Sequence, residues 1–220
     1  MRKALLACGF VAAVLYIAMM QLITYDGYNW ISQVVSELSA VGAPTRPLWF
    51  WLGWVYTALI LAFGWGVWTS AGANRALRVV GGLILFSGFL CLLWPFAPMH
   101  QREVLAAGGG TLSDTMHIAL SIVTVPLFLL TVGFGAAAFG TRFRLYSIAT
   151  IVIAFVAGAF TAVDGPRIAA NLPTPWLGLL ERINIAVYMI WLAVLAVTLL
   201  RRSARRAPGS ARPALTGAAV

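Results

Sequence analysis

A stripe of polar side chains begins near residue 114, at the head of a long apolar run. Three, four and three residues separate its members, which are Asp114, His117, Ser121 and Thr124. This spacing places them on one face of a helix. Because polar groups are costly against lipid, we expect the face to point into a helix bundle. Thr111 and Asp114 also fit a capping box, which would give Asp114 an ordinary structural role.

A second stripe begins a later apolar run, with Glu181, Asn184 and Tyr188 at positions i, i+3 and i+7. The pair Thr174-Pro175 is a suitable helix start, which puts Glu181 roughly 9 Å inside the helix at 1.5 Å per residue. An ionisable group at that depth needs a partner or water. The alternative is that Glu181 lies at headgroup level as an ordinary end charge.

The segment at about 30–40 has an amphipathic pattern. Apolar residues share one helical face, and these are Ile31, Val34, Val35 and Leu38. Ser36 and Glu37 fall on the opposite face, Asn29 can cap the start, and Gly42 can end the helix. Two interpretations fit this short helix. It is an interfacial linker, or it directs Ser36 and Glu37 into a cavity of the bundle.

Two further polar groups, Asp164 and His100, lie where apolar runs of the sequence end. Asp164 ends an apolar run before Gly165-Pro166, where a carboxylate opposes the helix dipole and should have a cationic partner. Arg167 is the nearest candidate and Arg182 is the alternative. His100 follows the end of the third apolar run.

Composition indicates that a membrane protein carries these groups. The 220 residues are 61% hydrophobic and only 10% charged, whereas soluble domains are about a quarter charged. This balance excludes a soluble enzyme and a nucleic-acid-binding domain. Six runs approach the ~20 residues that a helix needs to cross a bilayer. They are 4–25, 48–71, 79–97, 114–139, 145–164 and about 177–200.

The fold class that follows is all-α. We expect a polytopic bundle of six transmembrane helices, with the short amphipathic outer helix at about 30–40. Residues 1–200 would form this single domain, and 201–220 a basic, disordered cytoplasmic tail. Of the 15 Lys and Arg residues, eleven fall on the side of the two termini. The positive-inside rule therefore predicts cytoplasmic termini in the cell membrane. All six acids and both histidines fall on the other side.

One stretch resembles a known family. Residues 26–40 read Asp-x-x-x-x-Ile-Ser-x-x-x-Ser-Glu-Leu-Ser-Ala, and Gly-Ala-Pro follows at 42–44. This pattern resembles the first outer segment of prokaryotic six-span membrane proteins catalogued as domain of unknown function 998. The Asp114-x-x-His117 pair at the head of the fourth span is similar too. The resemblance covers residues 5 to 200 approximately. It implies a helical bundle and no established activity.

The candidate site combines the polar groups of the outer side. We expect them to converge there and to bind a lipid headgroup or a small polar or cationic ligand. The set consists of Ser36, Glu37, His100, Asp114, His117, Ser121, Asp164, Glu181 and Asn184. Membrane lipids are the other expected partners, and nucleic acid is not one. No cofactor is predicted, although four of these residues could ligate zinc by type, namely His100, Asp114, His117 and Glu181.

Three functions remain open at this point. The first and favoured one is binding or transport of such a ligand in a polar cavity on the extracytoplasmic side. The second is a membrane-embedded, metal-dependent hydrolase. The third is a structural or accessory subunit whose polar groups only hold the bundle together. Acids outnumber histidines, and no strong metal-ligand motif occurs, which favours the first.

Overall fold

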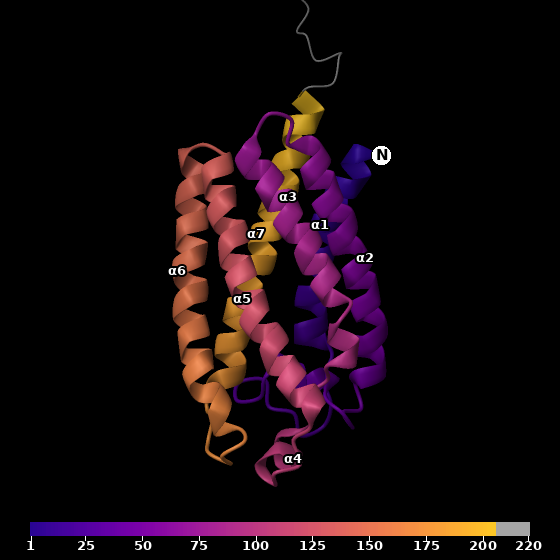
Figure 1. Ribbon diagram of the computed structural model, residues 1–220, viewed down its shortest axis with the longest axis vertical. Helices are drawn as coiled ribbons and strands as arrows, with labels where there is room; N and C mark the ends of the chain where they lie inside the picture. Colours follow the sequence, from indigo (N-terminus) through magenta and orange to yellow (C-terminus); the bar gives the residue numbers. More distant parts are fainter. Residues whose placement is uncertain (206–220) are drawn as a thin grey trace, which may run out of the picture.

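Six long helices form the body of the protein in a computed structural model that describes residues 1–205 (Figure 1). They make six candidate membrane spans by length and composition, of which the third extends over Arg75–Phe96 and the fifth over Thr141–Arg167. They are α1 (Arg2–Leu22), α2 (Arg46–Ser70), α3 (Arg75–Cys91), α5 (Leu112–Ala138), α6 (Thr141–Asp164) and α7 (Leu177–Arg205). The short elements are the 3-10 helices η1 (Val35–Ser39), η2 (Trp94–Phe96) and η3 (Gly165–Arg167), and the helix α4 (Arg102–Ala106). The predicted all-α, six-span architecture is confirmed.

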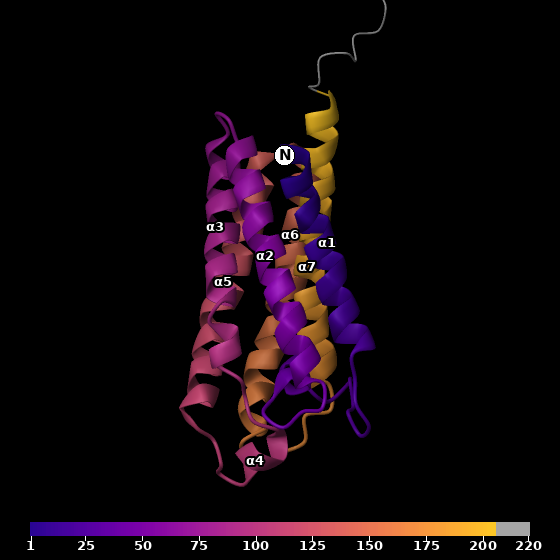
Figure 2. The ribbon, with the colours of Figure 1, turned by 90° about the vertical axis from the view of Figure 1, so that its right-hand side faces the viewer.

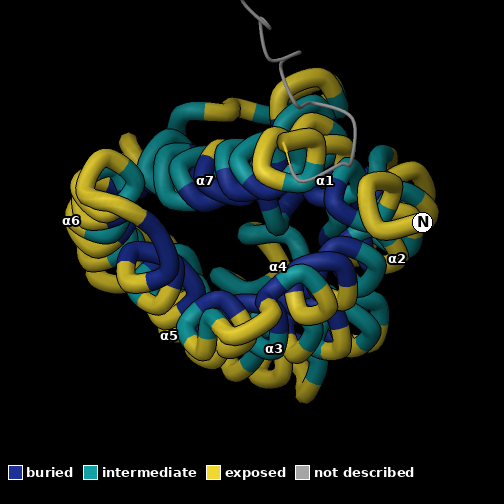
Figure 3. The backbone as a smooth tube through the Cα atoms, turned by 90° about the horizontal axis from the view of Figure 1, so that it is seen from above, coloured by how far each residue is buried: buried dark blue, intermediate teal, exposed yellow. Residues whose placement is uncertain are grey.

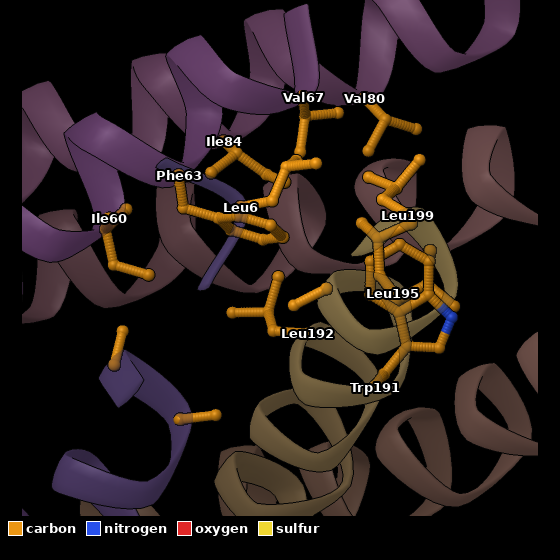
Figure 4. Packing of buried hydrophobic residues seen from close by; sticks show 14 of the residues in the cluster. Leu6, Ile60, Phe63, Val67, Val80, Ile84, Trp191, Leu192, Leu195 and Leu199 are labelled. Carbon is orange, nitrogen blue, oxygen red and sulfur yellow. The ribbon is translucent and has the colours of Figure 1, made fainter. Parts of the chain in front are cut away.

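The long helices are arranged as a ring. Each packs against the next in the order α1, α2, α3, α5, α6 and α7, and α7 closes the ring against α1 (Figure 3). Large side chains fill the interior, including the fully buried Leu6, Phe63 and Trp191 (Figure 4). Gly9 lies against the ring of Phe63 and Gly135 against that of Trp191. Small residues of this kind allow close approach between membrane helices.

The two ends of the ring differ in charge. α1 begins and α7 ends at the same end, which also holds the turn between α2 and α3 (Figures 1 and 2). We call this the basic end, because the arginines of that turn and of both helix ends gather there. The acidic end is the opposite one, formed by residues 23–45, 92–111 and 165–176. The sequence places all six acids in or beside these segments.

Helix α7 is longer than the sequence indicates. It continues as a helix to Arg205, so the first five residues of the predicted tail belong to the bundle. The arginines in this stretch do not end the helix. Basic side chains are favourable in a last turn because they are attracted to the negative end of the helix dipole. Residues 206–220, the rest of the predicted tail, lie outside the described residues.

The segment at 30–40 is not the amphipathic surface helix that its pattern predicts. Only Val35–Ser39 form a 3-10 helix, and Glu37 is fully buried there rather than on a solvated face. The side chain of Asn29 accepts hydrogen bonds from the N–H groups of Ile31 and Ser32, which holds the chain in a turn before η1. Residues 23–45 therefore fold across the acidic end of the ring (Figure 2).

Candidate functional site

A buried ion pair anchors the segment 23–45. Glu37 is fully buried, and its two carboxylate oxygens accept from Nε of Arg102 at 2.9 Å and from Nη2 of Arg102 at 2.6 Å. The side chain of Gln33 and the N–H of Val34 also donate to this carboxylate, at 2.8 and 3.1 Å. These four hydrogen bonds replace the water that Glu37 loses on burial.

Arg102 ties three outer segments together. Its guanidinium donates to the carbonyl of Ser32 at 3.1 Å and to the hydroxyl of Thr174, just before α7, at 3.2 Å. The hydrogen bond to Glu37 raises the pKa of Arg102 above its ordinary value, so the guanidinium stays charged. Arg102 is absent from the set of site residues that the sequence predicts. The available signal was that Arg102 is the one basic residue in the outer segment at 98–113.

Asp114 and His100 form a second pair. Nδ1 of His100 lies 2.9 Å from one carboxylate oxygen of Asp114, and the backbone N–H of His100 donates to the other at 2.7 Å. Asp114 also accepts from the N–H and the hydroxyl of Thr111, which completes the predicted capping box of α5. The carboxylate of Asp114 is thus engaged in structural contacts at both oxygens.

Ser36 is the point at which three segments meet. Its hydroxyl oxygen lies 3.1 Å from Nε2 of His117 on α5, and its side chain is a close neighbour of the Glu181 carboxyl group on α7. Glu181 also accepts from the backbone N–H of Val35. The other ring nitrogen of His117, Nδ1, lies 2.9 Å from the carbonyl oxygen of Ala97. The contact between Ser36 and His117 joins residues that are 81 positions apart in the sequence.

The carbonyl of Ala97 decides the donor and acceptor roles, because it can only accept. Nδ1 of His117 must carry a proton, and in the neutral ring Nε2 accepts the hydroxyl proton of Ser36. The oxygen of Ser36 can then accept a proton from a neutral Glu181. With a second proton on His117 both bonds reverse, and Ser36 donates to a Glu181 carboxylate. A hydrogen bond from Ser36 to Glu181 would complete a proton path between His117 and Glu181.

Arg182 is not the partner of Asp164. It is buried, and its guanidinium donates to the phenol oxygen of Tyr28 at 2.7 Å and to the carbonyls of Trp30 and Gln33 at 2.8 and 3.2 Å. Arg182 thus binds the backbone of the 23–45 segment to α7. Burial raises the pKa of Tyr28 to about 12, although Arg182 acts in the opposite direction.

Three predicted site residues lie outside this cluster of contacts. Asp164 pairs with Arg167 at 3.8 Å, which confirms the nearer of its two candidate partners. Asn184 lines a small cavity between α5, α6 and α7 of about 10 Å³. Ser121 points its hydroxyl to the backbone carbonyl of His117, 2.9 Å away, one turn further along α5. Local helix geometry accounts for the contact of Ser121.

The predicted convergence is otherwise present at the acidic end. The structure brings Glu37, Ser36, His117 and Glu181 together beneath the 23–45 segment, with the His100–Asp114 pair beside it through the backbone contact of His100 with Val41. Whether these residues bind a ligand stays a prediction. Two cavities formed by the described residues, of about 10 and 100 Å³, are lined by other residues than these. Among residues 1–205, no three His, Cys, Asp or Glu side chains form a group that could hold a metal ion.

Comparison with known proteins gives a family. Residues 6–198 match the family described as "Protein of unknown function (DUF998)". The chain belongs to this family, because the match covers most of its length. The chain matches no curated protein and no solved structure.

Proposed function

We propose that the protein is a membrane-embedded binding or transport protein that takes a small protonated amine at Glu181. One observation carries this proposal. Glu181 is the partly buried acid at the acidic end that has no cationic side chain within 4.0 Å among the described residues. An enclosed carboxyl group without such a partner is suited to binding a cation or a proton.

The other acids at this end do not offer the same opportunity. Glu37, Asp114 and Asp164 have partners of their own in Arg102, His100 and Arg167. The remaining two, Asp26 and Glu103, are exposed to solvent. Arg182 follows Glu181 in the sequence, but it donates its hydrogen bonds to Tyr28 and to backbone carbonyls.

The surroundings of Glu181 suggest an organic ammonium group rather than a metal ion. Metal cations such as Ca²⁺ take six to eight oxygen ligands, whereas Glu181 has the hydroxyl of Ser36 and the ring of His117 as polar neighbours. Aromatic side chains are near as well. Tyr16 packs against Trp49 with ring centroids 6.0 Å apart, in the apolar cluster that also contains Val35, whose N–H donates to Glu181. Carboxyl and aromatic groups together favour ammonium cations.

A proton path from Glu181 through Ser36 to His117 would let the proposed site release a proton when it binds the amine. When an ammonium group binds, the Glu181 carboxyl group must be ionised to attract it. The proton it gives up can pass through the hydroxyl of Ser36 to Nε2 of His117, which is 3.1 Å away. Binding would then be weaker at low pH, where His117 already carries two protons.

The experiment is a thermal-unfolding titration of the purified full chain with methylammonium chloride, against equal concentrations of sodium chloride. We expect the midpoint to rise with methylammonium only, and Glu181→Gln to lose the rise. The matched control is Glu103→Gln, which removes an exposed acid from the same end and should keep the rise. An equal rise in the Glu181→Gln protein would overturn the proposal. Methylammonium flux into vesicles then separates transport from binding alone.

A second candidate function rests on the Ser36–His117 contact itself. A hydroxyl 3.1 Å from an imidazole nitrogen has the distance of a nucleophile and its general base. The carbonyl of Ala97 would orient the ring, in the position that a carboxylate takes in many hydrolases. A fluorophosphonate probe tests this candidate, since labelling that disappears in Ser36→Ala would indicate an activated serine. Labelling that is absent from the parent protein, or unchanged in the variant, would dismiss it.

A further inference from the structure

A second polar site lies at the basic end, far from the groups discussed above. A cavity of about 100 Å³ opens there between the start of α1, the turn from α2 to α3, and the last turns of α7. Its polar lining consists of Arg2, Ser70, Asn74, Arg202 and Ser203. The start of α1 and the end of α7 lie side by side in two perpendicular views (Figures 1 and 2).

The donors around this cavity are largely unused. Arg2 has no hydrogen bond or ion pair within residues 1–205, and the hydroxyl of Ser203 has none there either. The guanidinium of Arg202 stacks over the ring of Phe139, 4.3 Å from its centroid, which leaves its N–H edge free for hydrogen bonding. The sequence has no Asp or Glu in any segment at this end. Residues 1–205 therefore supply no counter-ion for the two arginines.

The floor of the cavity is held in a fixed geometry by Asn74. Its side-chain oxygen accepts from the N–H of Leu77 at 3.0 Å, which caps α3, and its side-chain nitrogen donates to the carbonyl of Ala138 at 2.9 Å. Asn74 therefore links the turn before α3 to the end of α5. Apolar side chains, among them Leu77 and Leu199, complete its wall.

We propose that this cavity binds the phosphate group of an anionic phospholipid. Two guanidinium groups across a small cavity suit a phosphate, to which arginine can donate two parallel hydrogen bonds. The N-terminus of α1 adds its partial positive charge to the same place. A lipid is the source that the position favours. The cavity lies at the basic ends of helices apolar enough to span a membrane, which is where we expect lipid headgroups, and its side chains Leu77 and Leu199 could contact the acyl chains.

Native mass spectrometry of the full chain, released from detergent micelles with phosphatidylglycerol or phosphatidylcholine, tests the proposal. We expect phosphatidylglycerol to be retained on the parent protein and the double variant Arg2→Gln/Arg202→Gln to bind it about tenfold more weakly. The matched control is Arg142→Gln, which removes a charge from an exposed arginine at the same end but outside the cavity. It should change lipid binding by less than about twofold.

A further variant distinguishes a shaped site from general charge. Arg202→Lys keeps the charge but loses the planar fork, so we expect binding between that of the parent and of the double variant. Equal losses in Arg142→Gln and the double variant would overturn the proposal, as would no loss in the double variant. A midpoint of unfolding that rises as much with inorganic phosphate as with phosphatidylglycerol would assign the cavity to a free anion and overturn the lipid assignment.

Discussion

Ser36 and His117 are in contact across the acidic end of the ring, with Oγ of the serine 3.1 Å from Nε2 of the histidine. The serine belongs to a segment between the first two long helices, and the histidine lies near the start of α5. This contact places the 23–45 segment over the ring interior and brings Glu181 into the same cluster.

The Glu37–Arg102 pair should dominate the stability of the acidic end. Arg102→Met leaves the fully buried carboxylate of Glu37 without its partner, and we expect a loss of about 3 kcal/mol in the free energy of unfolding. The double variant Glu37→Met/Arg102→Met should recover most of it, because no charge is left buried. Arg167→Gln is the control, since its pair with Asp164 is more exposed and is worth less than about 1 kcal/mol. Chemical denaturation in detergent measures all four proteins.

Tyr28 should make stability fall at alkaline pH. Burial raises its pKa to about 12, above the ordinary value of 10.0, so the folded state holds the phenol proton more tightly than the unfolded state. The stabilisation is complete below the ordinary pKa and is lost as the pH rises through about 12. We expect Tyr28→Phe to be less stable at neutral pH, because Arg182 loses an acceptor, but to show a smaller decline above pH 10. A decline as steep as that of the parent would contradict this role.

Gly178 should be essential for the seating of the 23–45 segment. A Cβ atom there would lie 2.7 Å from the carbonyl oxygen of Trp30, and backbone cannot move aside as a flexible side chain can. We expect Gly178→Ala to lower the midpoint of thermal unfolding clearly. Gly133→Ala, on α5 with open space at the Cβ position, should be neutral or slightly stabilising because alanine favours helix. Equal effects of the two substitutions would refute the packing argument.

The charge asymmetry predicts cytoplasmic termini, and cysteine labelling in whole cells tests this orientation. In a background with Cys8→Ser and Cys91→Ser, we expect Ala107→Cys and Ala170→Cys to react with a membrane-impermeant maleimide, and Ala73→Cys to react only after permeabilisation. All three alanines are exposed. The physical reason is that positively charged loops stay on the cytoplasmic side. The reverse labelling pattern would place the termini outside.

The sequence allows the six long helices to be predicted, because an apolar run of sufficient length has few alternatives in a bilayer. The inward direction of the α5 stripe is predictable too, because Asp114 and His117 repeat at helical spacing. In the structure both residues are less exposed than their neighbours in the sequence. The fold of residues 30–40 is not. The same pattern of Val34, Val35 and Leu38 fits a surface helix, and only contacts with distant helices bury these residues.

The partners of the buried charged groups could not be predicted from the sequence either. Arg102 contacts Glu37 across 65 residues, and no local spacing records that separation. Arg182 is held by backbone carbonyls and by Tyr28, and carbonyl acceptors leave no mark on residue type. Asp164 found its partner three residues away, where helical geometry does make the pair visible from the sequence. Short-range partners can thus be predicted, whereas the partners of buried charges depend on the packed structure.

Asp114 and His117 should respond differently to substitution, although they share one helix face. Asp114 caps α5 and binds His100, so Asp114→Asn should lower the free energy of unfolding by about 1 kcal/mol, while the rise in unfolding midpoint with methylammonium is kept. His117→Ala removes the group that would take up the proton released when Glu181 ionises. We expect the folded variant to bind methylammonium with an altered pH dependence.

Titration of both variants at several pH values separates a structural network from a binding site. In a purely structural network, both substitutions lower stability and neither changes the pH dependence of the methylammonium response. In a binding site, the response moves with His117 and not with Asp114, because only His117 is connected to Glu181 through Ser36. A methylammonium response that Asp114→Asn abolishes in a folded protein would instead place the cation at the His100–Asp114 pair.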